Sequence, residues 1–97
     1  MLSFLKEASI SDDTIEEILT NFPYDIVIAL DNNKKECLKI IELFKKIGIT
    51  NIEDLLIYES YIFLKSYNRI TDKLANCVVS KFVEEVNDDY AYIEKLI

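Results

Sequence analysis

The sequence has no histidine, no tryptophan, one glycine and one proline among its 97 residues. The lack of histidine removes the commonest general base and metal ligand. With Gly48 as the single glycine, no glycine-rich loop can cradle a phosphate. A strand-rich fold is also disfavoured, because its turns draw heavily on glycine and proline. Leu, Ile, Glu and Lys are abundant instead, and we expect an all-α fold.

Cysteine and long apolar runs are equally scarce. Cys37 and Cys77 lie forty residues apart with no Cys-x-x-Cys spacing, which argues against a zinc site and a Cys–His nucleophile. Both cysteines are better explained as small residues of the apolar core. The longest stretch without a charge is seven residues, for example 74–80, so we expect no membrane span. Because no apolar signal core follows Met1, we expect a reduced, cytoplasmic protein.

Acidic residues outnumber basic ones, and the two kinds are unevenly spread. Positions 1–33 carry seven acids and one lysine, 34–81 carry six acids and nine bases, and 82–97 carry five acids and one lysine. This distribution, with a net charge of −7, disfavours nonspecific binding to nucleic acid. The acidic pairs lack a calcium-loop pattern and suit the N-terminal ends of helices. We therefore expect no catalytic residue, no cofactor and no metal, and we expect that the protein is not an enzyme.

Apolar spacing and capping residues divide the chain into closely spaced helices. Ser11 or Asp13 should cap a helix that stops at Pro23, and Gly48 should end a long helix in a left-handed conformation. Thr50 to Glu53 has the spacing of a capping box. The expected helices are 3–7, one from its cap at Ser11 or Asp13 to Phe22, 24–30, 34–47, one from the Thr50–Glu53 capping box through Tyr58, about 60–67, 71–86 and a last one, capped by Asp88 or Asp89, that carries Ile93, Leu96 and Ile97.

The expected pattern of helices repeats along the chain. A shift of 39 residues places Lys6, Ile10 and Ser11 on Lys45, Ile49 and Thr50, and a shift of 37 places 15–19 on 52–56. Periods of this length are typical of stacked helical units that bury one another's apolar faces. We expect one domain, 1–97: a compact multi-helix bundle of two stacked repeat units, roughly 4–42 and 43–82, with a capping C-terminal helix at 88–97.

The segments Phe4 to Pro23 and Leu43 to Thr50 resemble the repeat of mitochondrial transcription termination factors (mTERF). The likeness covers about two units, residues 4–80, and implies a curved solenoid that holds nucleic acid in a basic groove. The chain departs from that pattern in its acidity, its small number of units, and Ser60 where a second proline is expected. Residues 48–55 also resemble a helix-hairpin-helix module, but the candidate hairpin, 66–70, has no glycine for phosphate binding.

The strongest basic patch should lie on the long helix, where lysines recur at helical spacing with Glu42 among them. Its candidate nucleic-acid residues are Lys35, Lys39, Lys46, Arg69 and Lys73. A solvated helix face explains such lysines better than a binding site does. We therefore favour a non-catalytic protein-protein interaction module that binds another protein, or a second copy of itself through the apolar C-terminal Ile93, Leu96 and Ile97. Docking of these three residues on the domain's own core is an equal alternative. The alternative is a nucleic-acid-binding helical repeat domain that uses the lysine face.

Overall fold

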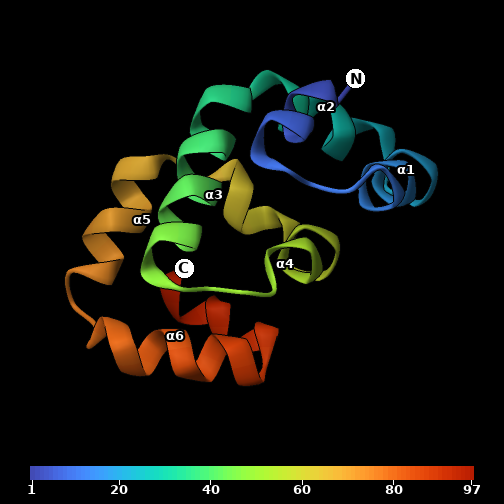
Figure 1. The fold of residues 1–97 in the computed structure, drawn as a ribbon. Coiled ribbons are helices and arrows are strands. Elements are labelled where there is room, and N and C mark those ends of the chain that lie inside the picture. Colours follow the sequence, from blue (N-terminus) through green and yellow to red (C-terminus); the bar gives the residue numbers. More distant parts are fainter.

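The computed structural model describes residues 1–97 and contains six α-helices, three 3-10 helices and no strand, which confirms the all-α class. The elements form a compact bundle measuring 35 × 24 × 22 Å (Figure 1). None of the helices combines the length and apolar character that a membrane crossing requires. In chain order they are η1 Ser3–Ala8, α1 Asp12–Asn21, α2 Tyr24–Asn32, α3 Lys34–Ile47, α4 Ile52–Tyr58, η2 Ser60–Leu64, α5 Tyr67–Leu74, α6 Val79–Asp88 and η3 Tyr90–Leu96.

Helix α3 runs through the middle of the bundle and packs against η1, α2, α4, η2, α5 and α6 (Figure 1). Its fully buried side chains are Cys37, Ile40, Ile41 and Phe44, as expected for a helix with a wide apolar surface. The rings of Phe44 and Phe63 meet edge to face at 5.8 Å, a favoured arrangement for aromatic pairs. The core is therefore organised around one helix.

The two helix ends that a shift of 39 residues aligns have the same backbone structure. Ser9 and Gly48 both adopt left-handed conformations, with φ of 61° and 102°. Beside Gly48 a Cβ would meet only ordinary contacts, so the positive φ is what favours glycine there. The matching hydrogen bonds, which form Schellman motifs, are Ser9 N to Lys6 O, Ile10 N to Leu5 O, Gly48 N to Lys45 O, and Ile49 N to Phe44 O.

The capping box expected at Thr50–Glu53 is not formed. Asn51 holds the N-cap position without a side-chain cap, and Glu53 reaches across to the start of α1. Its carboxylate accepts hydrogen bonds from the Ser11 backbone N–H at 3.2 Å, from the Ser11 hydroxyl at 2.7 Å and from the Thr14 hydroxyl. Ser11 itself caps α1 by accepting from the Thr14 N–H. A tertiary partner thus outcompetes the local motif, and Glu53 joins the start of α4 to the start of α1.

The prediction of one long helix at 71–86 is wrong. The structure has α5 and α6 in its place, joined by a corner at 75–78. Leu74, Phe82 and Val86 are buried as predicted, but Val78 is 71% exposed and occupies the N-cap position of α6. Apolar spacing identified the buried residues, yet it could not show that the helix axis changes direction between them. The helix expected at 60–67 also divides, because Ser66 caps a new helix, α5.

The C-terminal segment docks on the domain's own core. Asp89 caps η3 by accepting a hydrogen bond from the Ala91 N–H. Ile93 and Leu96 are fully buried, whereas Ile97 remains about half exposed. Two of the three apolar residues expected to form a contact surface between copies are therefore unavailable to a partner.

Replacing Val78 with serine should raise the free energy of unfolding by about 0.5–1 kcal/mol, because serine caps helices far better than valine. The matched change Val86→Ser, at a fully buried position, should lower it by about 2–4 kcal/mol through lost apolar contacts and a buried hydroxyl. Urea denaturation of both variants tests this difference. A clear loss of stability in Val78→Ser would contradict the corner between α5 and α6.

Glu53 should make the stability of the fold depend on pH in the acidic range. The hydrogen bond from Thr14, followed by those from Ser11, lowers the pKa of Glu53 below its ordinary value of 4.5 against a smaller effect of burial. A lowered folded-state pKa means that the carboxylate stabilises the fold above pH 4.5, and that this contribution disappears as the pH falls through the lowered value.

Glu53→Gln should therefore reduce the free energy of unfolding at neutral pH by about 1–3 kcal/mol. The difference from the wild type should close once the pH is below the lowered pKa of Glu53. Urea denaturation across this range measures both effects. The control Glu16→Gln, on the exposed face of α1, should change stability by less than about 0.5 kcal/mol. A difference for Glu53→Gln that stays constant with pH would exclude the ionised carboxylate as its cause.

Candidate interaction surfaces

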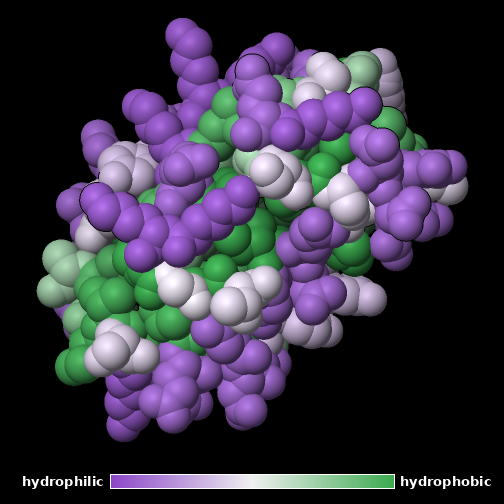
Figure 2. Space-filling model, in the orientation of Figure 1, coloured by the Kyte–Doolittle hydropathy of each residue, from purple (hydrophilic) through white to green (hydrophobic).

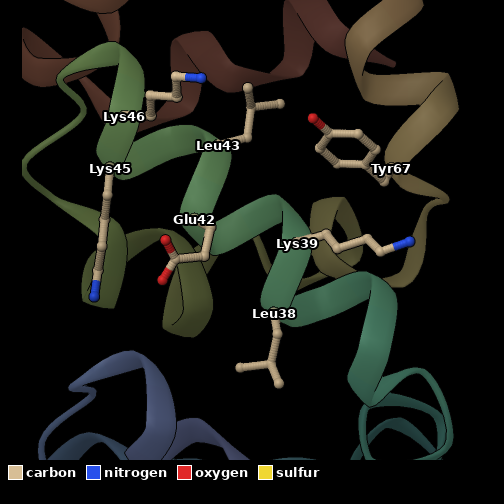
Figure 3. A pocket seen from close by; sticks show the side chains of 7 residues that line it. All are labelled: Leu38, Lys39, Glu42, Leu43, Lys45, Lys46 and Tyr67. Atoms are coloured by element: carbon tan, nitrogen blue, oxygen red, sulfur yellow. The ribbon is translucent and has the colours of Figure 1, made fainter.

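The largest depression of the molecule crosses the outer face of α3, and we call it the α3 groove. It encloses about 770 Å³ and is open to solvent. Figure 3 shows Tyr67 reaching in from α5 toward Leu43, while Leu38 points to the opposite side of α3. The lining residues are Leu38, Lys39, Glu42, Leu43, Lys45, Lys46 and Tyr67. The charged side chains Lys39, Glu42 and Lys46 therefore lie along the middle of this outer face, between the two leucines.

Helical spacing explains this lining. Residues four and three positions apart share a side of a helix, which yields one row of Leu38, Glu42 and Lys45 and another of Lys39, Leu43 and Lys46. The buried positions of α3 lie on the opposite side of the helix, where they face the core. Leu38 and Leu43 are half-buried, so each keeps part of its apolar surface in water. The rigid attachment of α3 to the core holds the groove open before any partner binds.

The lysines of the α3 groove differ in what they contact. The Lys39 ammonium lies 3.7 Å from the Glu36 carboxylate and 6.0 Å from the centre of the Tyr67 ring. Lys45 donates a hydrogen bond to the backbone carbonyl of Ala8. Lys46 is exposed and forms no ion pair. A partner's carboxylate would thus meet one free ammonium and one, on Lys39, that is only weakly held by an exposed pair.

A second surface, the α5–α6 corner, lies where these two helices meet η3. Figure 2 shows apolar surface at the lower left, over this end of the molecule. Val78 is 71% and Val79 37% exposed. The residues that line the depression are Lys73, Asn76, Cys77, Val78, Lys81, Phe82, Tyr92 and Lys95, with no acid among them. The corner therefore presents positive charge beside exposed apolar groups.

The five predicted nucleic-acid residues come from two helices: Lys35, Lys39 and Lys46 share the outer face of α3, whereas Arg69 and Lys73 lie on α5. Lys39 and Lys46 line the α3 groove, whereas Lys73 lines the α5–α6 corner. Lys35 lies at a third depression by the start of α3, together with Asn32, Asn33, Lys34 and Glu36. Arg69 is exposed on α5 and lines none of these depressions. Binding of nucleic acid by these residues stays a prediction.

Lys81 and Lys95 were missed because they come from different elements and no spacing in the sequence connects them. One local signal was present. Asn76 is a residue type common just after helix ends, and two β-branched valines follow it. Together they favour a helix break at the place where the structure has the corner.

Groups that could perform chemistry are dispersed. No three His, Cys, Asp or Glu side chains come together to hold a metal ion. Burial raises the pKa of the Cys37 thiol to about 12, which keeps it protonated and unreactive. Cys77 is partly exposed at the α5–α6 corner, where its thiol lies 3.5 Å from the Lys73 carbonyl. Glu59 is the one buried carboxylate.

Comparison with known proteins identifies no relative. No protein-family model matches the chain, and neither a curated protein nor a solved structure is significantly similar to it. The resemblance to the mTERF repeat, and the division into units 4–42 and 43–82, therefore stay predictions. The function is argued from the surfaces themselves.

The two thiols should react with a disulfide reagent at very different rates. In the native protein at neutral pH, Cys77 should react and Cys37 should not, because Cys37 is fully buried and protonated. Spectrophotometric titration should count one fast thiol per chain, and a second one after denaturation. The Cys77→Ser variant should show no fast reaction. Two thiols that react equally fast in the native protein would contradict the buried position of Cys37.

Proposed function

We propose that the protein is a non-catalytic protein-interaction module that binds its partner through the α3 groove. The observation that carries this proposal is the lining of the groove, in which Lys39, Glu42 and Lys46 lie between Leu38 on one side of α3 and Leu43 with Tyr67 on the other. Protein interfaces commonly combine an apolar centre with a polar rim. The groove offers both kinds of group, and it is the largest depression on the molecule.

The energetics of α3 favour binding at this position. Cys37, Ile40, Ile41 and Phe44 fix the inner side of the helix in the core. A partner would therefore gain contacts with the outer side without ordering any backbone, which removes a large cost of association. The partner surface should present apolar side chains to the two leucines and carboxylates to Lys39 and Lys46. Such a partner is a protein segment with one apolar and one acidic side.

Nucleic-acid binding, the alternative, has weaker support. Two of its five candidate residues, Arg69 and Lys73, lie on another helix than the three lysines, and Glu36 and Glu42 lie among the lysines of α3. Duplex or single-stranded nucleic acid needs a continuous run of positive charge along its backbone. The two functions differ in the chemistry of the bound partner, so one experiment can separate them.

Photo-crosslinking from the α3 groove tests the proposal. A photoreactive phenylalanine analogue placed at Tyr67, in cells that make the protein, should give a discrete protein adduct that mass spectrometry can identify. The matched control is the same analogue at Tyr24, which is 63% exposed on α2 and lies outside the groove. Adding Leu43→Ser to the Tyr67 substitution should reduce the adduct about tenfold or more, if this leucine contributes about 1.4 kcal/mol to binding.

Three outcomes would contradict a protein partner at the groove. One is the absence of an adduct from position 67, and another is an equal adduct from position 24. The third is an adduct that nuclease treatment removes, which would support the nucleic-acid alternative instead.

A further inference from the structure

The lysines of the α5–α6 corner come from three elements and remain without acidic partners. Lys73 lies in the last turn of α5, Lys81 in the first turn of α6, and Lys95 near the end of η3. The ion pairs of the molecule, Lys6 with Asp12 and Lys39 with Glu36, include none of them. Lys95 lies 5.8 Å from the centre of the Tyr92 ring, which holds its ammonium at the edge of the depression.

This local charge opposes that of the whole protein. The chain carries 18 acidic and 11 basic residues, yet no acid lines the corner. By contrast, the depression at the other end of α6 is lined by Glu84, Glu85, Asn87 and Asp88 and contains no base. A positive patch attracts an acidic partner to one place on the protein. The negative charge of the rest of the protein repels that partner elsewhere.

The corner also exposes apolar side chains that the fold does not use. Val78 and Val79 are adjacent, and Val78 has more of its surface in water than any other large apolar residue of the protein. Val78 moreover occupies an N-cap position, where Ser, Asp or Asn would stabilise α6 better. A residue that departs from the local preference and faces solvent is typical of a functional surface.

We propose that the α5–α6 corner is a second binding surface, selective for an acidic segment of a partner protein that also carries aliphatic or aromatic side chains. Carboxylates of the segment contact Lys73, Lys81 and Lys95, and its apolar side chains cover Val78 and Val79. This surface is separate from the α3 groove, with which it shares no lining residue. A protein segment fits better than a nucleic acid, because the most exposed apolar groups of the corner are the two valines, Phe82 is buried, and Tyr92, the one partly exposed ring, cannot form a row of stacking platforms.

Selection from a library of random 12-residue peptides, displayed on phage and panned on the whole protein, tests this proposal. Bound peptides should be enriched in Asp and Glu together with Leu, Ile, Val or Phe. Replacing Lys73, Lys81 and Lys95 with glutamine should weaken their binding at least about tenfold, equivalent to about 1.4 kcal/mol. Val78→Ser should weaken it severalfold while the fold is retained, since this change improves the cap of α6.

Two matched variants separate this surface from the α3 groove. Replacing Lys35, Lys39 and Lys46 with glutamine alters the net charge by the same amount as the triple corner variant. Leu43→Ser removes one of the apolar side chains that line the groove. Peptides that bind the corner should tolerate both variants. Peptides that lose binding only with Leu43→Ser would support the α3 groove and leave the corner without a ligand, which would overturn the present proposal alone.

Other results also overturn the proposal. These are a library that yields no binder, binders without an excess of acidic residues, and binders that the corner variants hold as tightly as the wild type. Displacement of the peptides by a twelve-nucleotide oligothymidine at equal concentration would likewise assign the corner to nucleic acid rather than to protein.

Discussion

Burial of the apolar surface of α3 is the interaction on which the rest of the structure depends. The helix has apolar residues on more than one side, and a helix of that kind is stable in water only if neighbours cover it. Six other elements do so, and the contact between Phe44 and Phe63 joins α3 to η2 inside the core. The outer side of the helix, with Lys39, Glu42, Lys46 and parts of Leu38 and Leu43, remains open to solvent. The same helix therefore holds the fold together and presents the groove.

Much of the fold could be predicted where the decisive signal is local. The limits of α3 follow from its apolar spacing and from Gly48, and both agree with the structure. Ser11 and Pro23 likewise begin and end elements as their chemistry predicts. Where a tertiary contact competes with a local preference, prediction failed. Glu53 was expected in a capping box, but the hydroxyls of Ser11 and Thr14 offer it stronger partners.

The candidate surfaces show the same division. Lys39 and Lys46 are seven positions apart on one helix, so helical spacing alone places them on the same face, and the structure agrees. The place of Tyr67 in the α3 groove and the existence of the α5–α6 corner could not be predicted without knowing the three-dimensional path of the chain. Leu74 and Phe82 satisfy a helical pattern together, yet they lie on two helices with a turn between them. Sequence periodicity reports burial well, but it does not report the direction of a helix axis.

Native-state hydrogen exchange of the α3 amides tests most directly whether this helix is the centre of one cooperative unit. If α3 depends on all its neighbours and they on it, the amides of Ile40, Ile41 and Phe44 should exchange only when the whole chain unfolds. Their opening free energy should then equal the free energy of unfolding from urea denaturation. Exchange of these amides through a local opening of lower free energy, while α1 or α6 stays protected, would contradict the account.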